Sequence, residues 1–151
     1  MVRTRTFQGL FLDQIRSLYS AETQLLRLLP RMTRAATLPA LKQDFLNHIE
    51  DTKENLARLE ELFHRLKDTP WGKHCSAMQG IVFECNGMTQ ANYCQSVRDA
   101  GLMAGAERIE HYETAAYGTA RAFALLLQDR QSAVQLKRTL KEESTTLKLL
   151  L

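Results

Sequence analysis

Long amphipathic segments constrain the fold of this chain more than any other feature of its sequence. Apolar residues recur at three- and four-residue spacing over about residues 7–36, from near Pro39 to before Lys67, over about 97–128, and from about 132 onward. Seven glycines and three prolines are too few for a turn-rich all-β protein, and no segment alternates as a strand does. We therefore predict an all-α fold in which residues 1–151 form a single domain.

The breaks between these segments predict how the helices are connected. Pro30 lies inside the first segment and predicts a kink or an end of that helix. Residues 76–96 form a long connection that carries one or two short helices, with a break expected at Asn86-Gly87. A long connection between the second and third main helices is typical of a ferritin-like four-helix bundle, and a plain up-and-down bundle is the alternative.

Charge and composition exclude several classes of protein. The net charge is +3, but basic residues are scattered among acids and no basic run interleaves with aromatic residues, so nucleic-acid binding is not expected. The apolar part of the N-terminus is interrupted by Gln8, Asp13 and Gln14, and is therefore neither a signal peptide nor a membrane span. Three cysteines without CxxC spacing argue against a disulfide scaffold or a zinc site, and predict reduced thiols in a cytoplasmic protein.

Acidic residues fall on or beside the apolar stripe of every long helix. On the first helix the stripe contains one glutamate, on the third it contains two that are three residues apart, and on the fourth one lies toward its edge. On the second helix a histidine and an aspartate flank the stripe. These candidate metal ligands are Glu22, His48, Asp51, Glu110, Glu113 and Glu143.

Burying several ionised carboxylates together costs several kcal/mol each, and some would have to bind protons. A pair of divalent cations would remove the repulsion and replace the lost hydration with oxygen ligation. The alternative is that each acid pairs with an arginine or lysine at the edge of its helix. The sequence leaves both interpretations open.

Five stretches of the chain resemble the YciE/YciF family of bacterial ferritin-like proteins, in the same order and at similar spacing. The stretches are "LYSAETQLLRLLPRM", "FLNHIEDTKENLARLE", "CSAMQGI", "RDAGLMAGAERIEHYETAAYGT" and "LKRTLKEESTTLKLL". The resemblance implies a ferritin-like bundle that is often dimeric, is linked to stress responses and has no established biochemical activity.

The same resemblance implies metal ligands at Glu22, Asp51, Glu110, Glu113 and Glu143, in an arrangement similar to the rubrerythrin-like variant that is associated with peroxide reduction. The chain departs from the family at three positions: Asp51 replaces a glutamate, Asn55 replaces a histidine, and Leu147 stands where relatives can have aspartate. His48 lies three residues before Asp51 and offers a compensating nitrogen ligand. Its alternative role is that of a hydrogen-bonded structural residue.

We also predict the surroundings of two residues close to the glutamates of the third helix. His111 follows Glu110 directly and should face outward, because successive residues point about 100° apart around a helix. Tyr117 lies one turn after Glu113 on the same stripe. It is expected either to hydrogen-bond a ligating carboxylate or to be a packed core residue.

Three functions fit these observations. The first is an oxidoreductase that holds two iron or manganese ions, acts on peroxide or oxygen, and receives electrons from a separate protein. The second is a metal-free dimeric structural or interaction protein. The third is an iron-storage cage, for which the chain lacks an obvious fifth long helix. A homodimer is expected in the first two cases.

Overall fold

The computed structural model describes the backbone of residues 6–150 and the side chains of residues 6–140. Within that part the chain is helical and contains no strand, which confirms the all-α prediction. The helices are α1 (Phe7–Ala35), α2 (Pro39–Leu66), α3 (Ser76–Gln90), α4 (Gln95–Leu126) and α5 (Arg130–Leu150). The four long helices are those expected from the apolar periodicity, and α3 belongs to the connection.

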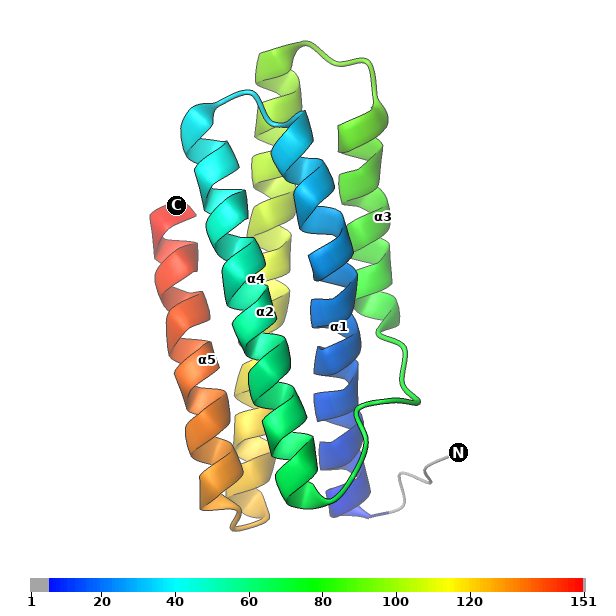
Figure 1. Ribbon diagram of the computed structural model, residues 1–151, viewed down its shortest axis with the longest axis vertical. Coiled ribbons are helices and arrows are strands. Elements are labelled where there is room, and N and C mark those ends of the chain that lie inside the picture. Colours follow the sequence, from blue (N-terminus) through cyan, green and yellow to red (C-terminus); the bar gives the residue numbers. More distant parts are fainter. Residues whose placement is uncertain (1–5, 151) are drawn as a thin grey trace.

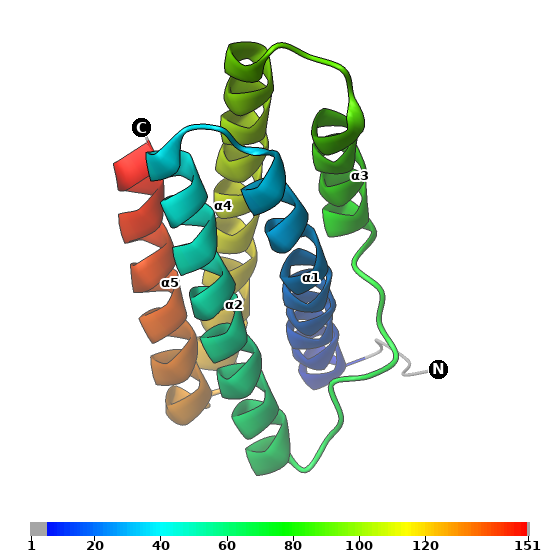
Figure 2. The same ribbon diagram turned by 45° about the horizontal axis from the view of Figure 1, so that its top comes forward.

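The helices form a four-helix bundle with a crossover (Figure 1). Helices α1 and α2 make one antiparallel pair, and α4 and α5 make the other. The chain leaves α2 at one end of the bundle and returns to the other end before it enters α4, with α3 on the way (Figure 2). Helix α3 packs against α1 and α4. The predicted ferritin-like topology is therefore confirmed, and the plain up-and-down alternative is wrong.

Helices α2 and α4 end in the same backbone conformation. Each helix is followed by a residue in the left-handed region, Lys67 with φ 56° and Gln128 with φ 60°. The next backbone N–H groups, of Asp68 and Asp129, donate to carbonyls five residues earlier at 3.0 Å and 2.9 Å. These bonds satisfy carbonyls that would otherwise lack partners at a helix end.

Pro30 does not end the first helix, because α1 continues to Ala35. A proline inside a helix costs about 3 kcal/mol, since it removes a hydrogen bond and crowds the preceding turn. Leu28, Leu29 and Met32 are fully buried around it. Burying such side chains contributes about 1.5–3 kcal/mol each, which offsets the cost of the proline.

The expected break at Asn86-Gly87 is also absent, and α3 is one continuous helix. Cys85 and Met88 of α3, which lie on either side of Asn86-Gly87, pack against α4. A Cβ atom built on Gly101 would lie 2.1 Å from Met88 Cε, and one built on Gly105 would lie 2.6 Å from Cys85 Sγ. The two glycines of α4 thus let α3 approach closely, and this packing outweighs the weak helix propensity of the Asn-Gly pair.

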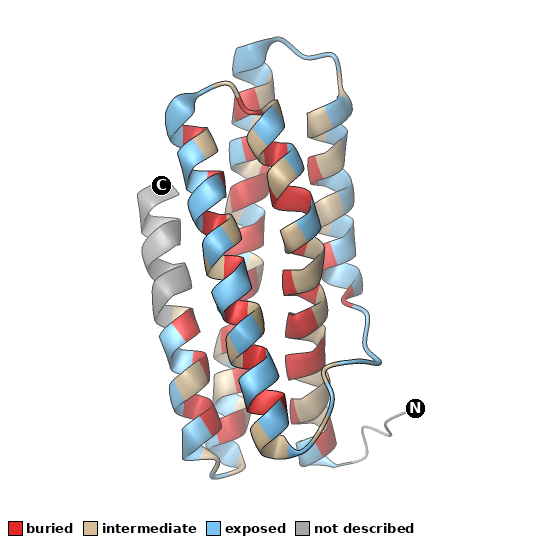
Figure 3. Cartoon of the chain, in the orientation of Figure 1, coloured by how far each residue is buried: buried red, intermediate tan, exposed pale blue. Residues whose placement is uncertain are grey.

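Two apolar clusters fill the bundle, and a polar layer lies between them along the helices. One cluster contains Leu25, Phe45 and Ile109, and the other contains Leu18 and Tyr117. Figure 3 shows that buried residues follow the inner faces of the long helices. None of the helices in the described residues is both long enough and apolar enough to span a membrane.

Candidate metal centre

Helix α4 contributes two glutamates to the layer between the apolar clusters. Glu110 and Glu113 are three residues apart, and this spacing places them on one face of the helix. Both side chains are 0% exposed. The flanking residues Ile109 and Tyr117 are also buried, so packing of α4 in the bundle forces the carboxylates inward.

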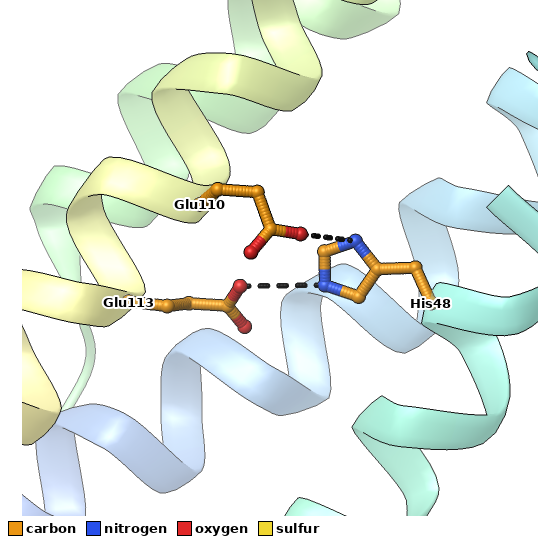
Figure 4. Close-up of side chains that lie close together, drawn as sticks. All are labelled: His48, Glu110 and Glu113. Carbon is orange, nitrogen blue, oxygen red and sulfur yellow. Dashed lines mark ion pairs between the residues drawn. The ribbon is translucent and has the colours of Figure 1, made fainter. Parts of the chain in front are cut away.

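His48 on α2 brings the two carboxylates together (Figure 4). Its Nδ1 lies 3.1 Å from Glu110 Oε1, and its Nε2 lies 3.3 Å from Glu113 Oε2. The three residues offer ligand atoms that all lie within 4.8 Å of one another. The structure therefore places one imidazole and two carboxylates, all buried, around one point.

The protonation states that this geometry permits are limited. A neutral imidazole has one N–H donor and one acceptor nitrogen, whereas an imidazolium has two donors. Both nitrogens of His48 face carboxylate oxygens. Either His48 is charged, or a carboxyl group carries a proton, or a cation takes the place of one contact. With His48 charged and both carboxylates ionised, the three groups still carry a net negative charge.

Glu22 on α1 joins the same polar layer through two other side chains. It is 0% exposed, and its Oε1 accepts hydrogen bonds from the Tyr117 hydroxyl at 2.7 Å and from the Asn55 amide at 3.2 Å. Tyr117 comes from α4 and Asn55 from α2, so Glu22 is held by both neighbouring helices. Tyr117 thus hydrogen-bonds a buried carboxylate and also packs in an apolar cluster, and the prediction that Glu22 is a metal ligand stays a prediction.

Asp51 and Glu143 are the two other predicted ligands. Asp51 is half-buried on α2 and is not among the three residues that converge. Glu143 and Leu147 lie in the part of α5 whose side chains the structure does not describe. His111 is exposed, as its position on the helix predicts, and lies 3.8 Å from Glu107.

Asn55 is the polar residue whose role the sequence did not reveal. It is 1% exposed and donates to Glu22. The available signal was its position, since it follows His48 by two helical turns and therefore lies on the same face of α2. An asparagine buried there has to find a hydrogen-bond partner, and a carboxylate is a strong acceptor.

A bundle of four long helices with a crossover, and with buried carboxylates and a histidine in its middle layer, defines a ferritin-like protein. The family model described as a domain of unknown function, DUF892, matches residues 6–151, and the chain belongs to this family.

Known relatives agree with this assignment. Protein YciF of Escherichia coli K12 is 36% identical over 143 residues, which cover 94% of this chain and 86% of that protein. The crystal structure of YciF, described as a stress protein, matches with a TM-score of 0.93 at 35% identity and covers 97% of this chain and 93% of that one. YcfI of Rhodopseudomonas palustris, suggested to be a structural protein, matches with a TM-score of 0.94 at 33% identity, over 99% and 96% of the two chains.

Proposed function

We propose that this chain is a stress-response protein that binds iron or manganese in the middle of its bundle and acts on peroxide or oxygen. The observation that carries the proposal is the convergence of His48, Glu110 and Glu113 within 4.8 Å in a buried layer. The description of YciF as a stress protein supports the physiological setting.

The donor set fits these metals. Imidazole nitrogen suits iron, and carboxylate oxygen suits manganese and other hard cations, whereas thiolates would favour copper(I) or zinc. Glu22 would add a third carboxylate from α1, and the sequence predicts Asp51 and Glu143 as further ligands. When bound, such a metal supplies the one-electron steps that reduction of peroxide or oxygen requires.

The residues of the chain have distinct roles in this proposal. The carboxylates of Glu110 and Glu113 offset the positive charge of the cation, and one nitrogen of His48 binds it. The other nitrogen of His48 stays hydrogen-bonded to a carboxylate, which fixes the orientation of the ring. Tyr117 and Asn55 hold Glu22 in place through the hydrogen bonds described above. The apolar clusters on both sides keep water out and strengthen these interactions.

Metal content tests the proposal directly. Protein purified without chelator, and protein reconstituted with iron(II) or manganese(II) without oxygen, should contain metal by mass spectrometry. Glu110→Gln should lose it, whereas Glu107→Gln, one turn earlier on the surface of α4, should retain it. A metal at 100 times its Kd stabilises the folded state by about 2.7 kcal/mol, which raises the unfolding midpoint by about 5–10 °C. Only metal-loaded wild type and Glu107→Gln should then consume peroxide.

The alternative function is a metal-free structural or interaction protein. It is supported by the similarity to YcfI and by His48, which can itself balance one carboxylate. Reconstituted protein that contains no metal and shows no thermal shift would favour this alternative. In both cases we expect a homodimer, which light scattering measures directly. The metal-dependent function additionally requires a separate electron donor.

A further inference from the structure

A surface cavity lies between α1 and the loop that follows α2, on the outer side of α1. Its volume is about 220 Å³. Tyr19 and Arg27 of α1 line one side, and Trp71, Lys73 and His74 of the loop line the other. None of the candidate metal ligands whose side chains the structure describes lines this cavity.

Hydrogen bonds fix both sides of the cavity to each other. The backbone N–H of Cys75 donates to Ser20 Oγ at 2.9 Å, and the Gln24 amide donates to the Cys75 carbonyl at 3.1 Å. At the start of the loop, Arg16 donates to Asp68 at 2.6 Å. The loop is therefore tied to α1 before and after Trp71, and the cavity is formed without a ligand.

Trp71 supplies an aromatic surface that this fold leaves open. Its ring meets Tyr19 edge to face, with centroids 5.3 Å apart and an interplanar angle of 89°. The residue nevertheless remains 67% exposed. A large apolar side chain that is fixed in a tied loop and left open to solvent is a ready platform for another planar ring.

The charge around this platform is positive. Two cations, Arg27 and Lys73, line the cavity, and no acidic residue is among the described residues that line it. Asp13 Oδ2 lies 4.0 Å from Lys73 Nζ and offsets part of its charge, and Glu60 accepts a hydrogen bond from the Tyr19 hydroxyl at 2.8 Å. The open side of the cavity thus suits an anion.

We propose that this cavity binds a planar aromatic ring that carries a phosphate, as a mononucleotide does. Bases stack favourably on aromatic side chains, whatever the base. The guanidinium of Arg27 matches the geometry of phosphate oxygens, and Lys73 adds a point charge. The volume of about 220 Å³ lies below the range of about 300–1,000 Å³ that is usual for ligand pockets, so the ring would occupy the cavity and the phosphate would lie at its open side. The inference does not depend on the proposed metal chemistry.

The fluorescence of Trp71 reports binding at this cavity, because Trp71 is the only tryptophan of the chain. Its emission is titrated with flavin mononucleotide and with AMP, and calorimetry repeats both titrations without an optical signal. Riboflavin and adenosine lack the phosphate, and inorganic phosphate lacks the ring. Arg27→Gln removes a cation from the cavity. Arg31→Gln is the matched control, because Arg31 is exposed one turn later on α1 and lies outside the cavity.

Binding of at least one mononucleotide with a Kd below ~1 mM, or about −4 kcal/mol, is expected. The matching unphosphorylated compound, inorganic phosphate, and the Arg27→Gln variant should each bind at least tenfold more weakly, and Arg31→Gln should bind as wild type does. Trp71→Ala, followed by calorimetry, should weaken binding similarly.

Three results would overturn the proposal. The first is that neither mononucleotide binds below ~1 mM. The second is that Arg27→Gln and Trp71→Ala bind as wild type does, or that inorganic phosphate alone binds equally well. The third is that Trp71 emission depends on protein concentration without ligand and that Trp71→Ala lowers the mass measured by light scattering. That result would assign the platform to a second copy of the chain.

Discussion

The hydrogen bond from Tyr117 to Glu22 gives the sharpest test of the polar layer. The two oxygens lie 2.7 Å apart, and the two residues are 1% and 0% exposed. Tyr117→Phe removes only the hydroxyl and leaves the ring in its apolar cluster. A hydrogen bond to a charged acceptor contributes about 1.5–3 kcal/mol to stability. We expect the free energy of unfolding of the variant to fall by that amount.

The loss should be visible in two assays. After treatment with chelator, the variant should unfold at a lower urea concentration than wild type, and the slope of the unfolding free energy against urea concentration should be unchanged. In a chain of this size each kcal/mol corresponds to about 2–4 °C, so the thermal midpoint should fall by about 3–12 °C. Tyr93→Phe is the matched control, because Tyr93 is 45% exposed and its substitution should change stability by less than about 0.5 kcal/mol.

A double-mutant cycle shows whether the acceptor is ionised. In the Glu22→Gln background the Tyr117 hydroxyl still has an acceptor, but a neutral one, so Tyr117→Phe should cost only about 0.5–1.5 kcal/mol. Equal costs in both backgrounds would contradict an ionised Glu22. A cost below about 0.5 kcal/mol in the wild-type background would refute the hydrogen bond itself.

Three further predictions concern other parts of the bundle. Burial opposes ionisation of Asp99, but hydrogen bonds from Thr37 and the adjacent backbone lower its pKa. The stabilisation that ionised Asp99 provides is fully present above the pKa of Asp99 in the unfolded chain, about 3.9. It is lost as pH falls through the lower pKa of Asp99 in the folded protein. The urea midpoints of wild type and Asp99→Asn should therefore converge below about pH 4. Gly105→Ala should cost about 1–3 kcal/mol, because the new Cβ would lie 2.6 Å from Cys85 Sγ, and adding Cys85→Ala should recover part of it. A nearby serine hydroxyl lowers the pKa of exposed Cys94, whereas burial raises the pKa of Cys85 to about 11. Iodoacetamide at pH 7.5 should therefore label Cys94 first and Cys85 only after unfolding, and peptide mass spectrometry identifies the labelled cysteine.

The sequence predicted the long helices because their apolar periodicity extends over many turns. It failed where a local signal competed with packing. Pro30 lies in a helix whose neighbouring residues are fully buried, and Asn86-Gly87 lies in a helix that two glycines of α4 allow to pack closely. A single sequence shows the propensity of such residues but not the partner helix that overrides it.

The candidate site was predictable to the level of helix faces. Glu22, Glu110 and Glu113 are buried, and their positions on apolar stripes indicated this. The contact of one histidine with both glutamates of α4 was not predictable. It depends on how far α2 is rotated and shifted against α4, and this is set by packing of the whole bundle rather than by the sequence around His48.

The sign of one stability change separates the metal-dependent function from the structural one. In metal-free protein, Glu110→Gln removes one of two like charges whose ligand atoms lie within 4.8 Å, and a neutral amide can still accept a hydrogen bond from His48. At an effective dielectric constant of about 20, the repulsion removed is about 3.5 kcal/mol at that distance, whereas a charged His48 at 3.1 Å from Glu110 would attract it by about 5 kcal/mol. A cation-binding site in which His48 is neutral and both carboxylates are ionised should therefore gain stability when one charge is removed, as binding sites often do. If the ion pair with His48 instead serves only to hold the bundle together, the same substitution should cost about 3–5 kcal/mol. Urea unfolding of chelator-treated Glu110→Gln, with Glu107→Gln as the half-exposed control, measures which of these holds, and a clear loss of stability would contradict the metal-binding interpretation.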